Sequence, residues 1–293
     1  MIRYPITLAA IKGRIAALKA TWFDRTIQAI NNLPAKPKSS DFNALWSEIK
    51  DVYIELQHSK CAFCEKPLEG RIEQDVEHFR PKAEVEPWQP PQDLVTAGLN
   101  LRQPGDGSKE LGYRFLAYHP LNYAAACKTC NSIFKGNLFP IAGPRKTKAK
   151  RPPANSTEQP YLIYPISKLD DDPEDLINFV GCVPQPVKPA GHDRLRAQVT
   201  ISIFKLDDPV ERRVFYVGRA KSIQLLFLNL VTIDDSADQP LVQLARSNVT
   251  RMLRASEPYA NCLRCFNRLY GQSRADATQV FHDLTVFLDT VSP

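Results

Sequence analysis

The sequence lacks a long apolar run, and its most hydrophobic stretch lies at 225–230. That stretch is far shorter than the roughly 18 residues that a membrane span needs. No acidic residue precedes Asp24, as in some targeting peptides, but the segment continues as an amphipathic pattern past Trp22, so we expect no targeting peptide. Internal repeats are absent as well. These absences predict a cytoplasmic protein with no membrane partner.

The composition is that of an ordinary globular protein. Hydrophobic residues make up 43% of the 293 residues and charged residues 24%, which provides enough apolar material for a sizeable core. A chain of this length suits one elaborate domain or two modest ones. The net charge of +6 permits nucleic-acid binding without demonstrating it, because only clustered charge attracts a phosphate backbone strongly.

Apolar residues in the N-terminal segment predict two helices. In the second helix they recur at the spacing of one helix face, at Phe42, Leu45, Trp46, Ile49, Val52, Tyr53 and Leu56. Ser40 or Asp41 can cap this helix. The proline-containing stretch 33–38 separates it from the helix before.

The second half of the chain is predicted to be mostly helical, with one strand. Val199, Ile201 and Ile203 alternate on one face, which predicts a strand over 199–206. The Asp-Asp-Pro sequence at 207–209 is typical of a helix start. A last amphipathic helix is predicted over 280–288.

Stretches rich in glycine, proline or charge divide the chain, at 87–91, 103–109 and 143–160. We therefore predict an α+β fold in four parts. An N-terminal helical segment covers residues 1–58, an irregular cysteine-bearing core covers 59–142, a basic linker covers 143–160, and a mostly helical C-terminal region covers 161–293.

Four of the seven cysteines form two C-x2-C pairs, Cys61/Cys64 and Cys127/Cys130. Two thiolates at this spacing can reach one tetrahedral ion, and two such pairs complete a closed structural zinc site. The long separation of the pairs is acceptable, because the cost of loop closure grows only logarithmically with length. The alternative is four buried or reactive cysteines without metal. We favour Zn²⁺, which would hold together a segment too irregular to build its own core.

The other three cysteines are predicted to be core residues. Cys262 and Cys265 share one face of a predicted helix, and Cys182 stands alone, so no second pair completes a metal site.

Between and after the two cysteine pairs lie residues suited to phosphodiester hydrolysis. Glu77 and His78 are adjacent, Asn122 follows, and Asn131 comes directly after the second pair. A carboxylate and an amide oxygen can hold one hard cation, Mg²⁺ or Mn²⁺, with positions left for water and phosphate. Such an ion stabilises charge on the phosphate and the departing oxygen. A neutral histidine beside it can take a proton from the attacking water.

Basic residues accompany this set. Arg80, Lys82 and Lys135 are predicted to offset the charge of a substrate phosphate. His119 lies just before Asn122 but outside the pattern, and we predict a structural role for it.

These motifs resemble the HNH nucleases of the ββα-metal fold. The resemblance is carried by both C-x2-C pairs and by Glu77, His78, Pro81, Asn122, Asn131 and Lys135. More narrowly, the stretches 75–82, 112–118 and 135–140 are similar to the HNH subunit of Septu-type and retron-associated anti-phage systems, which usually acts beside an ABC-type ATPase. The strong match covers about 80 residues.

The resemblance implies a ββα-metal core over 59–142 and a role for each matching residue. His78 is the expected general base, and Glu77 and Asn131 are the expected ligands of the catalytic ion. Asn122 is expected to orient the loop that holds the base, through backbone hydrogen bonds. The family more often has Asp where this chain has Glu77, so Asp75 is an alternative ligand.

Two charged stretches each allow two interpretations. The five basic residues within 145–151 could neutralise backbone phosphates or form a solvated linker. The acidic residues Asp170, Asp171, Asp172, Glu174 and Asp175 could form a second metal site. We prefer helix capping for the acidic stretch, with Pro173 at the first helical position.

We expect a metal-dependent HNH endonuclease that cuts nucleic acid, with DNA favoured over RNA although the motif reads only the phosphate backbone. The resemblance implies 5′-phosphate products, a role in phage defence and an ABC-type ATPase partner. The alternative is a zinc-stapled scaffold or binding subunit whose HNH site is not catalytic.

Overall fold

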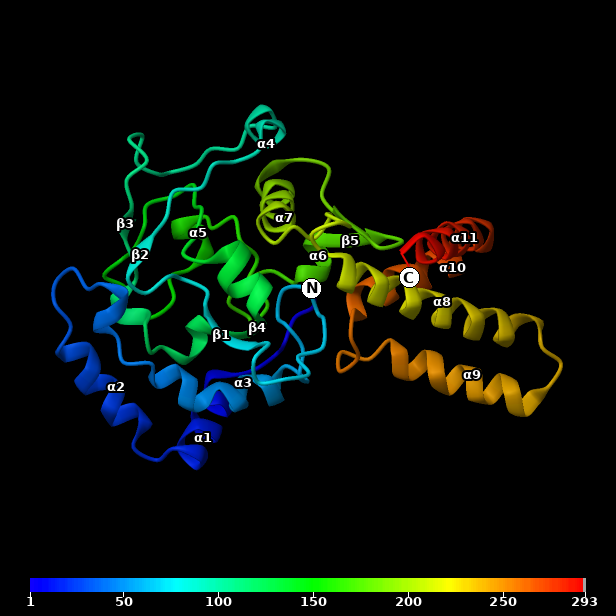
Figure 1. The fold of residues 1–293 in the computed structure, drawn as a ribbon, viewed down its shortest axis with the longest axis horizontal. Helices are drawn as coiled ribbons and strands as arrows, with labels where there is room; N and C mark the ends of the chain where they lie inside the picture. Colours follow the sequence, from blue (N-terminus) through cyan, green and yellow to red (C-terminus); the bar gives the residue numbers. More distant parts are fainter. Residues whose placement is uncertain (292–293) are drawn as a thin grey trace.

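The structure, a computed structural model, describes residues 1–291 and is an α+β fold of helices with three small sheets (Figure 1). The N-terminal segment forms α1 (Leu8–Leu18), α2 (Trp22–Asn31), the 3-10 helices η1 (Ser39–Asp41) and η2 (Leu45–Ile49), and α3 (Lys50–Leu56). Thr7 caps α1 by accepting a hydrogen bond from the backbone N–H of Ala10.

The helix predicted over 42–56 is present in two parts, because its first turns are the 3-10 helix η2 and its last turns are α3. Its apolar face is buried as predicted, at Phe42, Leu45, Ile49, Val52 and Tyr53. The predicted cap was wrong. Asp41 belongs to η1, where its carboxylate accepts a hydrogen bond from the backbone N–H of Lys38.

The centre of the molecule holds a two-stranded antiparallel sheet followed by a helix. Strand β1 (Gln74–His78) pairs with β4 (Tyr123–Cys127), and the register places His78 opposite Tyr123. The π-helix η5 (Thr129–Lys135) follows directly and contacts β1. Between the strands the chain forms β2 (Glu84–Val85), α4 (Gln92–Thr96), β3 (Glu110–Leu111), η3 (Arg114–Leu116) and η4 (Pro120–Asn122).

Residues 143–160 contain the short helix α5 (Asn155–Glu158) and touch the core at several points. The guanidinium of Arg145 lies 2.9 Å from the carboxylate of Glu110, and Glu158 is buried. Lys146, Lys148, Lys150 and Arg151 are exposed to solvent. Arg145 is therefore neutralised within the fold, and four basic side chains of this stretch face solvent.

The C-terminal region begins with α6 (Pro173–Leu176) and the hairpin of β5 (Ile177–Val180) and β6 (Val183–Pro186). Five longer helices follow: α7 (Gly191–Ile203), α8 (Arg213–Asp235), α9 (Gln239–Met252), α10 (Ala260–Gln272) and α11 (Arg274–Val291). The helix predicted over 280–288 lies within α11, so that prediction is confirmed.

The strand predicted over 199–206 was wrong, because residues up to Ile203 belong to α7. Val199 and Ile203 are four apart, so they also share a helix face, and Val199, Thr200 and Ile201 are all buried. When a helix is buried around most of its circumference, its sequence lacks the regularly spaced polar residues of an exposed helix face. Without them the sequence pattern does not distinguish a helix from a strand. The predicted helix start at 207–209 is a turn instead.

The acidic stretch 170–175 does not form a metal site. Asp172 caps α6 by accepting from the backbone N–H of Glu174, with Pro173 in the first turn, as predicted. Asp170 has a different role, since its carboxylate lies 2.5 Å from the buried guanidinium of Arg196.

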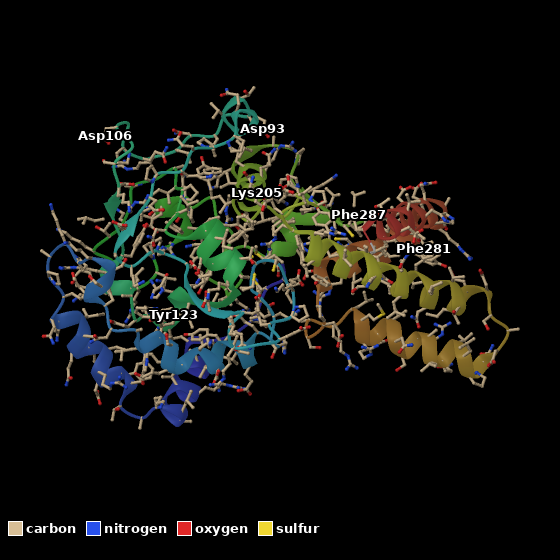
Figure 2. The ribbon with its side chains drawn as sticks, in the orientation of Figure 1. Asp93, Asp106, Tyr123, Lys205, Phe281 and Phe287 are labelled. Carbon is tan, nitrogen blue, oxygen red and sulfur yellow. The ribbon has the colours of Figure 1, made fainter. Side chains whose placement is uncertain are left out.

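Helices α8 and α9 extend from the rest of the molecule as an antiparallel pair, with α10 and α11 packed on α8 (Figure 1). Phe281 and Phe287, both on α11, lie in this region (Figure 2). By length and composition α8 is apolar enough to cross a membrane, but half of its most apolar window is buried inside the fold.

Candidate zinc centre and neighbouring polar site

The four cysteines of the two C-x2-C pairs gather at one buried point, as the sequence predicted. Their sulfur atoms all lie within 4.8 Å of one another, and the Sγ atoms of Cys64 and Cys127 are 3.8 Å apart. Four sulfurs at 2.3 Å from a tetrahedral zinc ion would be separated by about 3.8 Å. The donor set and its spacing therefore fit a structural zinc ion held by Cys61, Cys64, Cys127 and Cys130.

Backbone hydrogen bonds shape the first pair into a tight turn and attach it to the sheet. The N–H of Cys61 donates to the carbonyl of Lys66, and the N–H of Glu65 donates back to Cys61. The N–H of Ala62 donates to the carbonyl of Ala125 on β4. Because β4 ends at Cys127, this bond brings the two pairs together.

A buried arginine from the C-terminal region contacts the thiol cluster. Arg212, directly before α8, lies 3.1 Å from the Sγ atom of Cys130 and is 6% exposed. Four thiolates around a divalent ion carry net negative charge, so a guanidinium here offsets part of it. Nothing in the sequence pointed to Arg212, since it lies far from both cysteine pairs and belongs to no motif.

The thiols also influence one another's ionisation. Hydrogen bonds from the neighbouring thiols hold the pKa of Cys64 well below its ordinary value. Burial raises the pKa values of Cys61 and Cys130. A cluster in which one thiol ionises readily is suited to capturing a cation.

His78 ends β1 and is held by a backbone carbonyl. Its Nε2 atom lies 3.0 Å from the carbonyl oxygen of Ala117, and its ring packs edge-on against Trp46 and Tyr123, at centroid distances of 4.7 and 5.0 Å. Tyr123 lies on β4 (Figure 2). Since a carbonyl can only accept, Nε2 must carry the proton, which leaves the lone pair on Nδ1.

Burial lowers the pKa of His78 well below 6.5, and the nearby positive charge of Lys82 lowers it further. The ring is therefore neutral at pH 7. A neutral imidazole with a fixed tautomer has the protonation state that a general base requires.

Asn122 ties together the two segments around His78. Its side-chain oxygen accepts from the backbone N–H of Arg80 at 2.9 Å, and its NH₂ group donates to the carbonyls of Arg80 and Leu116. The side chain is fully buried. These are backbone hydrogen bonds to the loop after His78, of the kind that the resemblance implies for this position.

Glu77 leaves β1 on the face covered by η5 and forms a buried ion pair there. Its carboxylate contacts the ammonium of Lys135, and the two side chains are 2% and 0% exposed. Lys135 also donates to the carbonyl of His78 at 3.2 Å. Burial raises the pKa of Glu77, and Lys135 opposes that rise. Lys135 is therefore paired inside the fold, and its role at a substrate phosphate stays a prediction.

Asn131 is placed with Asp75 instead of Glu77. Its NH₂ group lies 3.1 Å from the Asp75 carboxylate, and the hydroxyl of Ser132 lies 3.3 Å from the same oxygen. Asp75, the alternative ligand, is therefore the carboxylate in contact with Asn131, while Glu77 contacts the ammonium of Lys135. The catalytic ion stays a prediction.

Arg80 and Lys82 lie in different environments. Arg80 is buried, and its Nε atom lies 2.8 Å from the carboxylate of Glu158, so it too is paired inside the fold. Lys82 is half-buried, with its ammonium 4.7 Å from the ring centroid of Trp46. Of the three basic residues, Lys82 has no carboxylate among the salt bridges of the described residues, and its role at a phosphate stays a prediction.

The residues predicted to be structural are buried or bonded within the fold. Cys182, Cys262 and Cys265 are buried, and each thiol donates a hydrogen bond to an oxygen atom. The Nδ1 atom of His119 accepts from the backbone N–H of Leu121 at the start of η4.

Comparison with known proteins gives one similarity. The chain is 28% identical over 131 residues to the Septu protein PtuB of Bacillus mycoides (strain KBAB4). The match covers 45% of this chain and 38% of that protein, so the relative extends well beyond the matched part. No family model matches the chain, and no solved structure does.

Proposed function

We propose that this chain acts in Septu-type anti-phage defence and hydrolyses phosphodiester bonds of nucleic acid. The similarity to the Septu protein PtuB supports the defence role. The hydrolytic role is supported most by His78, whose Nε2 atom is fixed by the carbonyl of Ala117 while Nδ1 keeps its lone pair. General bases in enzymes are often histidines whose tautomer and ring orientation are fixed by a hydrogen bond to a backbone acceptor.

In this mechanism Nδ1 of His78 takes a proton from the attacking water as the water oxygen bonds to phosphorus. The bond from phosphorus to the 3′ oxygen breaks, and the departing 3′ oxygen takes up a proton from solvent, which leaves a 5′-phosphate. The ammonium of Lys82 lies over the ring of Trp46, which also contacts the ring of His78, and this supports a role for Lys82 in attracting the phosphate charge. Asn122 holds the loop between these two residues in position. The general base is expected to contribute about 10²–10⁴-fold to the rate.

The test is nicking of supercoiled plasmid and cleavage of labelled single-stranded DNA and RNA. The parent is compared with His78→Ala, each with Mg²⁺, Mn²⁺ or excess EDTA. We expect cleavage by the parent and a loss of at least a hundredfold in the variant. His192→Ala is a matched control, because His192 lies on α7, away from this site. Equal cleavage by the parent and His78→Ala would refute the assignment.

A second candidate function is a zinc-stapled binding subunit. It is favoured by the internal pairing of Glu77 with Lys135 and of Arg80 with Glu158, which commits these charges to the fold. This candidate predicts that the parent does not cut any substrate, even with its partner, but still binds it. We propose an ABC-type ATPase as the partner, and co-purification with the tagged chain tests this.

A further inference from the structure

A cavity beside the His78 site combines aromatic rings with positive charge. It has a volume of about 340 Å³ and lies between α1, α2, the segment around η3 and η4, and the exposed basic stretch. Its lining includes Lys12, Phe23, Phe115, Tyr118, His119 and Lys150. This volume falls within the range of small-ligand sites.

The charge at the cavity is positive. None of its lining residues, all within residues 1–291, carries a carboxylate. The ammonium of Lys12 lies 6.0 Å from the ring centroid of Phe23, and Lys150 is exposed. Burial lowers the pKa of His119 to about 4, with further lowering by Lys12 and Arg151, so both of these cations are close to its ring. The cavity therefore attracts an anion.

The aromatic side chains connect the cavity to the proposed base. Tyr118 lines it and stacks on Trp46 at a centroid distance of 6.1 Å. Trp46 in turn contacts the ring of His78. Ala117, whose carbonyl holds His78, directly precedes Tyr118 in the chain. A group bound in the cavity is thus separated from His78 by two side chains, those of Tyr118 and Trp46.

We propose that this cavity binds an unpaired nucleotide of a single-stranded nucleic acid. Its base would pack on Phe115 and the neighbouring apolar residues, and its phosphates would contact Lys12 and Lys150. Aromatic rings beside lysines are how proteins hold single strands without reading sequence. A paired base cannot enter such a cavity, because its faces are covered by its neighbours in the stack. This inference rests on the proposed function and narrows its substrate class to single strands.

The experiment measures binding, which is independent of cleavage. Fluorescence anisotropy follows a labelled 12-nucleotide single strand, as DNA and as RNA, and the matching duplex, all with the full chain carrying His78→Ala to prevent cutting. Phe115→Ala in this background is expected to weaken single-strand binding about tenfold, which is the usual effect of losing one stacked base. Duplex binding should stay within twofold. Phe115→Leu, which keeps an apolar side chain without the aromatic face, should weaken binding as well.

Lys150 gives a second test with a control in the same basic stretch. Lys150→Ala should reduce the slope of log affinity against log salt by about 0.7 for a single strand, since one phosphate contact is lost. Lys148→Ala is the control, because Lys148 is exposed nearby but does not line the cavity. A Lys148→Ala slope equal to that of Lys150→Ala, or unchanged single-strand binding in both Phe115 variants, would overturn the inference.

The two proposals can fail separately. Loss of single-strand binding in the Phe115 variants supports the cavity even if the parent cuts nothing. Cleavage that depends on His78 but is unaffected by Phe115→Ala would support the nuclease and overturn the cavity.

Discussion

The buried pair of Glu77 and Lys135 allows a sharp test of what holds the central sheet and helix together. We consider Lys135→Met, which keeps an unbranched side chain of similar length and removes the ammonium. The carboxylate of Glu77, 2% exposed, then has no cation in contact. Breaking a buried pair by removing one partner costs about 3–5 kcal/mol, because the remaining charge is uncompensated.

The loss of unfolding free energy in Lys135→Met should depend on pH, and the burial of Glu77 determines the direction of this dependence. Burial already raises the pKa of Glu77, and the variant lacks the ammonium that opposes this rise, so the folded-state pKa rises further. A group whose folded pKa exceeds its unfolded pKa contributes stability below the unfolded value and loses it as pH rises. The penalty of Lys135→Met should therefore be largest near pH 8 and shrink as pH falls towards the ordinary range of a glutamate.

The assay is urea unfolding followed by circular dichroism, with zinc present throughout. The double variant Lys135→Met with Glu77→Leu removes both charges and should recover most of the loss, since apolar replacement of a buried pair is often neutral. Single and double variants together form a double-mutant cycle. If Lys135→Met were as stable as the parent at pH 8, the ammonium would not be part of the fold. Lys135 would then be free to act at a phosphate, as the sequence first suggested.

Three further predictions follow from the zinc centre, the second buried pair and the base. Zinc should bind at one ion per chain, and its removal by a strong chelator should unfold the central segment, seen as loss of protection in hydrogen exchange; unchanged protection would argue against a structural ion. Arg80→Met should lower the free energy of unfolding in urea by about 3–5 kcal/mol, because it leaves Glu158 buried without a guanidinium partner. Lys146→Met is the control at an exposed position and should change this free energy by less than about 0.5 kcal/mol. Cleavage should be lost on acidification only at a pH below 6.5, because the base must be neutral and burial lowers the pKa of His78; loss centred above 6.5 would contradict its burial.

The thiol cluster could be predicted because its information is local. Each C-x2-C pair needs only a tight turn to place two thiols together. A tetrahedral zinc ion needs four ligands, so one pair predicts that a second pair lies beside it. The sequence could also predict which face of the 42–56 segment is buried, since seven apolar residues repeat at one spacing. Both predictions depended on short-range patterns, which a single sequence displays directly.

The partners of the charged residues could not be predicted in the same way. Glu77 pairs with Lys135 and Arg80 with Glu158, and in each case the partner lies more than 50 positions further along the chain. A sequence shows that a charge is present, but not whether another charge meets it in the core. The sequence therefore could not show that Lys135 and Arg80, two of the three basic residues predicted to contact the substrate, also pair with carboxylates inside the fold.

The strand error at 199–206 has a similar cause. Alternation and helical repetition both include positions four apart, so Val199 and Ile203 satisfied either pattern. Thr200 decides between them, because its hydroxyl accepts from the N–H of Ile163 and donates to the carbonyl of Tyr161. Those bonds bury a polar residue that would have faced solvent on a strand.

The contact of Arg212 with Cys130 has a consequence for how tightly the thiol cluster holds its ion. The thiol cluster joins residues 61–130, but the counter-charge comes from the residue just before α8, the helix that carries the extended α8–α9 pair. Four thiolates around a divalent ion leave net negative charge, so a zinc ion here would be held with the help of a guanidinium that the C-terminal region supplies.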